Sequence, residues 1–431
     1  MPQLSLLSPL APASQALAPG HRRPIRKPDA MTSPPPPLFK PLYLKALIII
    51  LPVLIVVLAS LGPDSVRYPD IQQDAAHRLY WIEQPERADN ELRLILTTTP
   101  AIAPEQRLIQ QTLAEVLQQQ LQQARQQLPL ASVIEARIQT LPDQLQLQLR
   151  WPAGAAPPDP GALIEALAKT PESDALQEAL AHHRARAYLA DQDPAQRLLN
   201  RLQTQLQGAN SDPASPARIQ QRYRQLFDQP PLQVFGGPDA TTLSALLRRT
   251  PPVKVIPAQP GPELDPAPAR LALNDARQPA MQLRGTLTAG REATDYSTEL
   301  LAVRSLQHLL ALQDSAGLKY RLVWQPLHRS SVLALILGAP FQATAARLIA
   351  PLDAELVEQV RVQQLALHEA QLQSPDGQLE QLAALAFHGL TAERLDGILE
   401  QLQQVSGDDI ARRIEHYLDP SPQILITLNG Q

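Results

Sequence analysis

The sequence contains no cysteine. This absence excludes disulfide bonds, cysteine-ligated zinc, iron–sulfur clusters and thiol nucleophiles, while leaving the cellular compartment open. Aromatic residues are also scarce, at 4% of the 431 residues, although 44% are hydrophobic. The core must therefore be built mainly from Leu, Ala, Val and Ile, in a chain long enough for two or three domains. The formal net charge of −4 gives no sign of a nucleic-acid or polyanion binder.

Common catalytic motifs are missing as well. None of the nine histidines lies four residues from another. The absence of such a pair excludes both H-x-x-E-H and H-E-x-x-H, because in each motif two imidazoles one helical turn apart bind one zinc ion. His182 and His183 are adjacent on a predicted helix, so they diverge by about 100° and are not expected to share a metal. No serine lies in a G-x-S-x-G elbow and no glycine cluster forms a phosphate-binding loop, so we expect no cofactor and no metal.

One long apolar run is present, at Ala46–Leu61. With its flanks it spans residues 42–62, about the 20 residues that cross a bilayer as a helix. Six basic residues precede it, whereas only Arg67 and Arg78 lie between residues 63 and 80. The positive-inside rule therefore predicts a single-pass protein of the bacterial inner membrane, with a disordered cytoplasmic tail at residues 1–41 and the folded part in the periplasm.

An alternative is a cleaved signal peptide, for which Val57-Leu58-Ala59 offers small residues near a cleavage point. Met31 is a second candidate start, and it would shorten the leader. The folded part is exported under either interpretation.

The exported part divides at a proline-rich linker, residues 250–268, with seven prolines. Residues 63–90 are expected to form a connector. A first α+β domain, residues 91–249, is predicted to contain a strand around Leu94, a helix at 104–128 and a hairpin turning at 141–143. Helices at 161–170, 173–190, 195–206 and 215–227, a strand at 232–237 and a helix at 239–249 follow.

The second α+β domain, residues 269–431, is predicted to follow the same plan. A strand at 281–288 leads to a helix at 293–313 and a hairpin at 318–337, then helices within 342–417 and a strand at 423–428. This order indicates an internal duplication of a mostly antiparallel sheet covered by helices on one face.

Three stretches carry a family resemblance: QVFGGPDATTLSALL, AGLKYRLVW and QVSGDDIARRIEHYLDPSPQILITLNG. In order and spacing they resemble the insulinase/pitrilysin family of zinc peptidases, over about residues 90–431. The resemblance implies paired α+β domains joined by a linker.

The chain departs from this family where the chemistry should lie. No histidine occurs between His77 and His182, the interval that contains the first-domain helix expected to carry H-x-x-E-H. Active relatives also place an arginine seven residues before the tyrosine of a G-L-x-Y strand entry, and this chain has Gln313 before Tyr320. By resemblance, Tyr320, Gln313, Gly317 and Leu318 are the candidate substrate-groove residues.

The resemblance and the missing motif together predict a non-catalytic family member. Its leading function is a structural or regulatory partner of an active insulinase-family zinc peptidase in the periplasm. The alternatives are a stand-alone periplasmic scaffold that binds peptides or unfolded proteins, an envelope assembly factor, and an enzyme with unrecognised chemistry.

Overall fold

A computed structural model describes residues 68–128, 132–207, 213–248, 264, 267–314, 319–339, 348, 352–389, 394–419, 421 and 423–430. All of them belong to one compact unit, Tyr68–Gln431. We call residues 68–248 the first lobe and residues 267–430 the second lobe. The predicted tail, the predicted membrane helix at 42–62 and most of the linker lie outside the described residues. Within the described ranges, no helix is long and apolar enough to cross a membrane.

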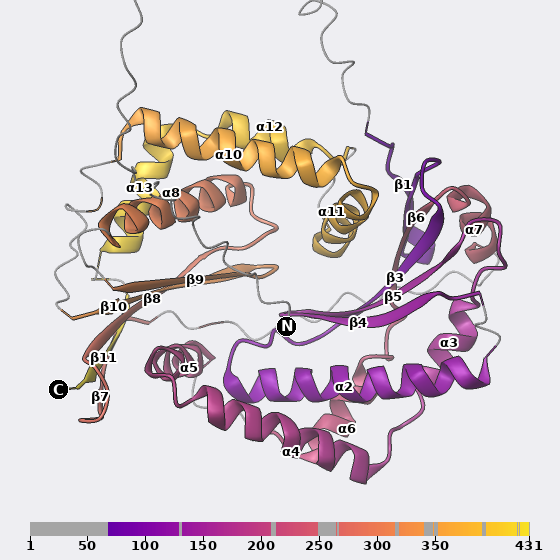
Figure 1. The fold of residues 1–431 in the computed structure, drawn as a ribbon, viewed down its shortest axis with the longest axis horizontal. Helices are drawn as coiled ribbons and strands as arrows, with labels where there is room; N and C mark the ends of the chain where they lie inside the picture. The colour runs from indigo at the N-terminus through magenta and orange to yellow at the C-terminus, as the bar shows by residue number, and fades with distance from the viewer. Residues whose placement is uncertain are drawn as a thin grey trace, which may run out of the picture. The chain divides into compact units, whose positions relative to one another are not determined.

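The first lobe is built on a six-stranded sheet with the order β1-β2-β6-β3-β5-β4 (Figure 1). β3, β5 and β4 run antiparallel to their neighbours, and β6 lies antiparallel to β3 and parallel to β2. The strands are β1 Gln72–Asp74, β2 Leu79–Glu83, β3 Asp89–Thr97, β4 Glu135–Leu141, β5 Gln144–Pro152 and β6 Leu232–Gly237, with a short 3-10 helix at Ala75–His77.

Residues 63–90 were expected to form a connector, but the strand β2 lies within this range. It lies inside the sheet, between β1 and β6, and buries Leu79, Trp81 and Ile82. Consecutive Trp81 and Ile82 point to opposite faces of the sheet, and both faces are covered here. A strand buried on both faces lacks the polar alternation by which the other strands are visible in the sequence.

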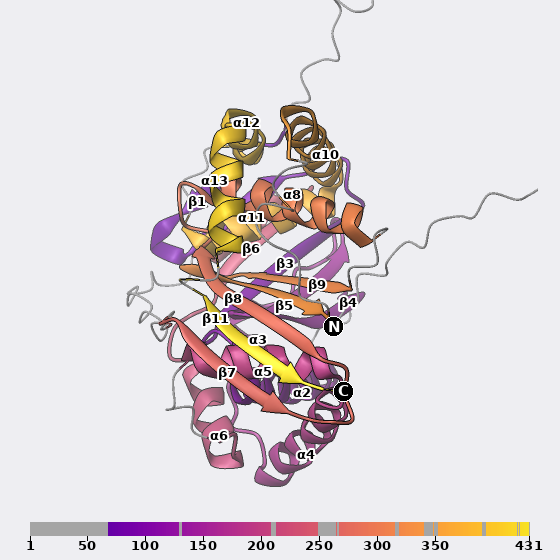
Figure 2. The ribbon, with the colours of Figure 1, turned by 90° about the vertical axis from the view of Figure 1, so that its left-hand side faces the viewer.

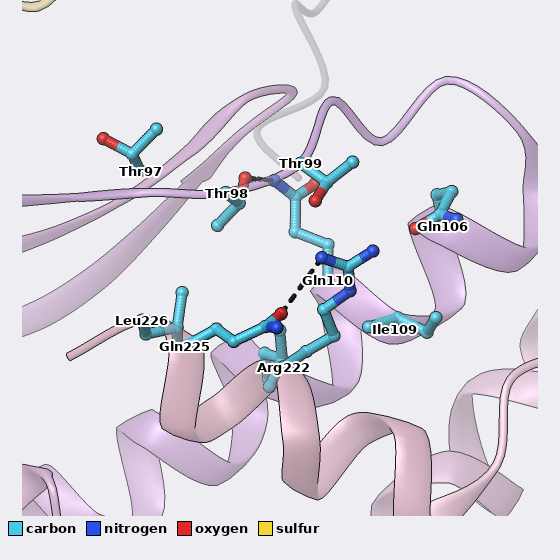
Figure 3. A pocket seen from close by; sticks show the side chains of 10 residues that line it. Thr97, Thr98, Thr99, Gln106, Ile109, Gln110, Arg222, Gln225 and Leu226 are labelled. Atoms are coloured by element: carbon cyan, nitrogen blue, oxygen red, sulfur yellow. Dashed lines mark hydrogen bonds between the residues drawn. The ribbon is translucent and has the colours of Figure 1, made fainter. Parts of the chain in front are cut away.

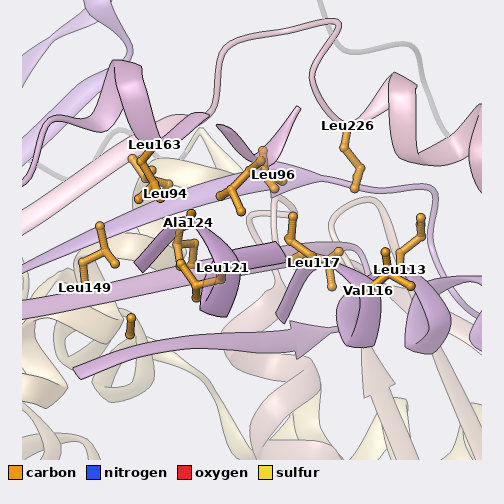
Figure 4. Close-up of a cluster of buried hydrophobic side chains, with 14 of the residues drawn as sticks. Leu94, Leu96, Leu113, Val116, Leu117, Leu121, Ala124, Leu149, Leu163 and Leu226 are labelled. Carbon is orange, nitrogen blue, oxygen red and sulfur yellow. The ribbon is translucent and has the colours of Figure 1, made fainter. Parts of the chain in front are cut away.

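The longest helix of the first lobe, α2 Pro104–Gln127, packs along one face of its sheet. Figure 4 shows Leu113, Val116, Leu117, Leu121 and Ala124 of this helix beside the sheet residues Leu94, Leu96 and Leu149. Their spacing of three and four places the apolar side chains on one side of the helix, as the sequence predicts. The other helices are α3 Pro160–Leu167, α4 Ser173–Ala190, α5 Pro194–Gln207, α6 Pro216–Gln225 and α7 Ala240–Leu247.

The second lobe repeats this topology. Its five-stranded sheet has the order β7-β11-β8-β10-β9, which matches β2-β6-β3-β5-β4 strand for strand, including the parallel pair β7–β11. The predicted duplication is therefore confirmed, with β7 as a strand that the sequence patterns did not indicate. The elements are β7 Ala269–Asn274, β8 Met281–Ala289, α8 Tyr296–Asp314, β9 Tyr320–Pro326, β10 Ser330–Gly338, α10 Ala354–Leu372, α11 Pro375–His388, α12 Gly397–Gln404, α13 Gly407–Leu418 and β11 Ile424–Asn429.

Each sheet is covered by helices on both faces, because one helix of each lobe packs on the sheet of the other lobe. The prediction of helices on one face only is therefore wrong. α5 places Leu198, Leu202 and Leu206 against the second sheet, where they join Ile336 and Ile426 in one apolar cluster. α11 packs on β2 and β6 of the first sheet. There its apolar residues join the sheet residues in a second cluster, Ile82, Ile95, Leu232, Val234, Leu379, Leu382 and Ala383.

Candidate functional site

α2 is the first-domain helix on which the sequence resemblance places the zinc motif, and it contains no histidine. Its Thr112 is fully buried and donates its hydroxyl to the carbonyl of Leu108. The half-exposed Glu115 faces α4, where Glu115 Oε2 lies 2.8 Å from His183 Nε2 and 3.4 Å from His182 Nδ1. Among the described residues, no group of three or more His, Asp or Glu side chains could hold a metal ion. The side chains around α2 therefore do not fit the zinc ion that the family resemblance implies.

The contact between α2 and α4 nevertheless brings together two histidines that were expected to diverge. The His183–Glu115 contact lacks the geometry of a hydrogen bond. Burial lowers the pKa of His183, and the Glu115 carboxylate acts in the opposite direction. With its pKa lowered, His183 is a neutral imidazole beside the Glu115 carboxylate at neutral pH, where α2 packs on α4.

Two of the four residues predicted from the resemblance to line a substrate groove lie in the described part of the chain. Gln313 lies in the last turn of α8, and Tyr320 begins β9, where it packs half-buried against the core of the second lobe. Gly317 and Leu318 lie outside the described residues. A groove formed by these four residues stays a prediction.

A pocket that encloses about 520 Å³ of empty space, open solvent included, lies where the two lobes meet, and we call it the junction cavity. The first lobe contributes the β4–β5 hairpin and Arg93 of β3, and the second lobe contributes residues near β8, β9 and α11. The lining residues are Arg93, Gln139, Leu141, Pro142, Asp143, Gln144, Gln146, Arg291, Pro326, Glu380, Ala384 and His388.

Two buried titratable groups face the junction cavity. Burial raises the pKa of Asp143, against the opposing effects of Arg291 and of the backbone N–H of His328. Burial lowers the pKa of His388 to about 3, and Arg291 and His328 act in the same direction. His388 Nδ1 lies 3.1 Å from His328 Nδ1, whose other ring nitrogen lies 3.2 Å from Glu292 Oε2. A neutral imidazole beside a buried carboxyl can transfer protons, but no hydroxyl lines this cavity to serve as a nucleophile.

A charged network beside the junction cavity joins β3 to the start of α11. Glu91, 1% exposed, lies 2.6 Å from Arg87, 2.8 Å from Arg93 and 2.8 Å from Arg150. Burial alone would raise the pKa of Glu91, but the three guanidinium groups together lower it. Arg87 and Arg150 also contact Asp376 in the first turn of α11, at 2.8 and 3.1 Å. The network therefore holds the second lobe against the first sheet.

A further cavity of about 420 Å³, partly open to solvent, lies where β3 ends and α2 begins (Figure 3). We call it the β3-end cavity. Gln110 lies at its centre and donates hydrogen bonds to Thr98 Oγ1 and to the carbonyl of Leu141. The lining residues are Thr97, Thr98, Thr99, Gln106, Ile109, Gln110, Leu113, Arg222, Gln225 and Leu226.

The residues of both cavities have ordinary local explanations in the sequence. Asp143 follows a proline in the predicted hairpin, where a turn residue is expected. Arg222 lies on a predicted amphipathic helix, where an arginine is ordinary. Their burial comes from segments distant in the chain, which no local pattern encodes. The signal that was available is a polar residue on a helix face that is otherwise apolar, as with Gln106 and Gln110 on α2.

Solved structures establish the fold. Neither a protein-family model nor a curated protein matches the chain. A peptidase M16 inactive domain from Pseudomonas fluorescens matches with a TM-score of 0.60 at 15% identity, covering 84% of this chain and 98% of that one. An M16-like peptidase from Alicyclobacillus acidocaldarius matches with a TM-score of 0.60 at 11% identity, covering 86% and 100%.

The chain also matches the periplasmic protease PqqL from Escherichia coli, with a TM-score of 0.54 at 12% identity. That match covers 84% of this chain but 48% of PqqL, so the chain spans about half the length of that protease. The chain therefore has the fold of the M16, or insulinase-like, peptidases. The resemblance predicted from the sequence is confirmed for the fold, and α2 lacks the histidines of the zinc motif.

Proposed function

We propose that the protein is a non-catalytic insulinase-fold subunit, anchored in the bacterial inner membrane, that partners an active zinc peptidase in the periplasm. The observation that carries the proposal is that α2, the helix on which the family resemblance places the zinc motif, contains no histidine. Its buried face consists largely of Leu, Ile and Val side chains packed on the sheet. A helix of this composition keeps the fold and cannot supply the two imidazoles that the zinc chemistry needs.

The length comparison supports a partner. The chain corresponds to about half of PqqL, described as a periplasmic protease, and to nearly all of the P. fluorescens domain described as inactive. A subunit of this size would supply one half of such a protease, and a second chain with an intact zinc motif would supply the other.

A pull-down tests the proposed partner. The full chain with a C-terminal tag is purified from detergent-solubilised membranes, and stoichiometric partners are identified by mass spectrometry. We expect an exported insulinase-family chain with an intact H-x-x-E-H motif. Recovery without a stoichiometric partner contradicts the proposal and favours the stand-alone scaffold. Peptide hydrolysis by the purified chain alone, abolished by a chelator, favours an enzyme instead.

A reporter fusion tests the proposed orientation separately. Alkaline phosphatase folds to an active form only outside the cytoplasm, so a fusion after residue 248 should be active in whole cells. A fusion that truncates the chain before residue 42 should be inactive. Equal activity of the two fusions contradicts the proposed topology.

A further inference from the structure

The β3-end cavity is lined by hydrogen-bond donors for which the described residues provide no acceptor. Gln110 donates to Thr98 Oγ1, so the hydrogen of that hydroxyl is free to point elsewhere. The hydroxyl of Thr99 has no hydrogen-bond partner within the described ranges. Gln106 is 8% exposed, and its amide makes no hydrogen bond to another described residue and keeps some contact with solvent.

A cation that makes no ion pair with any described residue lies beside these donors. The half-buried Arg222 donates to Gln225 Oε1 at 3.1 Å, and none of the residues that line the cavity is acidic. Burial lowers the pKa of Arg222, and the nearby Arg218 lowers it further. Partly buried guanidinium groups are usually paired with a carboxylate or phosphate, so the site has a positive potential that nothing in the lining offsets.

The rest of the lining is apolar. Ile109, Leu113 and Leu226 are apolar residues of the lining, and all three are buried. Figure 3 shows the guanidinium of Arg222 between Gln225 and Gln110, on the side of the cavity towards Ile109. An anionic group held by Arg222 would thus have apolar side chains within reach of the rest of the ligand.

We propose that the β3-end cavity binds a carboxylate carried on a short apolar body, as in the C-terminal leucine of a peptide. Arg222 pairs with the carboxylate, while Thr98, Thr99 and Gln106 donate hydrogen bonds to it. The apolar side chain packs on Ile109, Leu113 and Leu226. Backbone N–H groups capture terminal carboxylates in other peptide-binding proteins, and here side-chain donors take that role. The site goes beyond the proposed function and stands whether or not a peptidase partner exists.

Titration calorimetry on the purified full chain tests the ligand chemistry. The probes are acetyl-Gly-Ala-Leu with a free carboxylate, the same peptide amidated, and inorganic phosphate. We expect saturable binding of the free acid and at least tenfold weaker binding of the amide. Equal binding of acid and amide overturns the proposal, as does the absence of saturable binding of the acid. Binding of phosphate without the peptide also overturns it, since the apolar side chains then have no role.

Substitutions locate the binding. Arg222→Gln should weaken the binding of the free-acid peptide at least tenfold. Arg224→Gln removes the same charge two residues along α6, from an exposed position outside the cavity, and should leave the affinity within twofold. Thr99→Val keeps the side-chain shape, removes one donor and should weaken binding severalfold, a second test if Arg222→Gln fails to fold. Equal affinities for the wild type and either cavity variant place the ligand elsewhere and overturn the proposal.

Discussion

The contact between Leu202 of α5 and Gly285 of β8 provides a sharp test of how the two lobes are joined. Leu202 is fully buried, and a Cβ added to Gly285 would lie 2.3 Å from Leu202 Cδ1 and 2.6 Å from Cδ2. Atoms cannot approach so closely, so Gly285→Ala must push α5 away from the sheet or force Leu202 from its rotamer. Overpacking of this kind costs about 1–3 kcal/mol. Leu202→Ala removes the other side of the contact and, as a buried leucine, should cost about 3 kcal/mol.

The double variant is the informative one. In Gly285→Ala/Leu202→Ala the new methyl group occupies part of the space that the leucine vacated, so the clash disappears. We expect the double variant to cost about as much as Leu202→Ala alone, a favourable coupling of about 2 kcal/mol relative to the sum of the single changes. The free energies come from urea unfolding of the full chain followed by tryptophan fluorescence. Trp151 and Trp81 are buried in the first lobe, and they report its loss.

A remote pair supplies the control. Leu117 is also fully buried, but it belongs to the core between α2 and the first sheet, away from α5. Gly285→Ala and Leu117→Ala should therefore add to within about 0.5 kcal/mol. If Gly285→Ala and Leu202→Ala are additive to the same degree, α5 does not rest on β8, and the exchange of helices between the lobes is refuted.

Three further predictions concern charge. Because His388 has a pKa of about 3 in the folded chain and 6.5 otherwise, stability should fall as the pH drops below 6.5. His388→Gln should reduce the loss between pH 6.5 and 5 by about 2 kcal/mol, seen in urea unfolding at each pH; an unchanged slope contradicts this. Burial raises the pKa of Glu299 to about 7 from 4.5, so its stabilising effect is lost as the pH rises through 7. The melting temperature of Glu299→Gln minus that of the wild type should accordingly increase from pH 5 to pH 8. A difference that does not change with pH would argue against a protonated Glu299. Glu91→Gln leaves three arginines without their shared carboxylate and should cost about 3–5 kcal/mol of unfolding free energy, whereas a loss below about 1 kcal/mol would show that the network is not buried.

Local patterns predicted most of the elements, because in most of them apolar residues recur along one face with the period of a strand or a helix. The helix expected at 173–190 is observed at Ser173–Ala190, and the one expected at 104–128 at Pro104–Gln127. The hairpin was visible because Leu145, Leu147 and Leu149 alternate with glutamine and all three leucines pack against α2. The order of strands and helices was enough to predict the duplication, which the two matching sheets confirm.

The features missed from the sequence depend on contacts between the lobes. β2 is covered on its second face by α11, more than 290 residues later in the chain, so its sequence shows no alternation. The sequence predicts α5 as a helix with leucines along one side. That pattern does not indicate which sheet the leucines pack on, and the sheet is that of the second lobe. The candidate sites also depend on contacts between the lobes. Asp143 and His388 are buried where the lobes meet, and that burial shifts their pKa values.

This exchange of helices explains how the fold can do without a zinc motif. α2 is held by its apolar face, from Leu113 to Ala124, and by Arg107, which donates to Gln203 and Asn200 of α5. α5 in turn covers the second sheet, while α11 returns to cover the first. None of these contacts involves an imidazole, so the position of α2 is set by apolar packing on the first sheet and by its hydrogen bonds to α5. The fold of an M16 peptidase is therefore compatible with an α2 that contains no histidine.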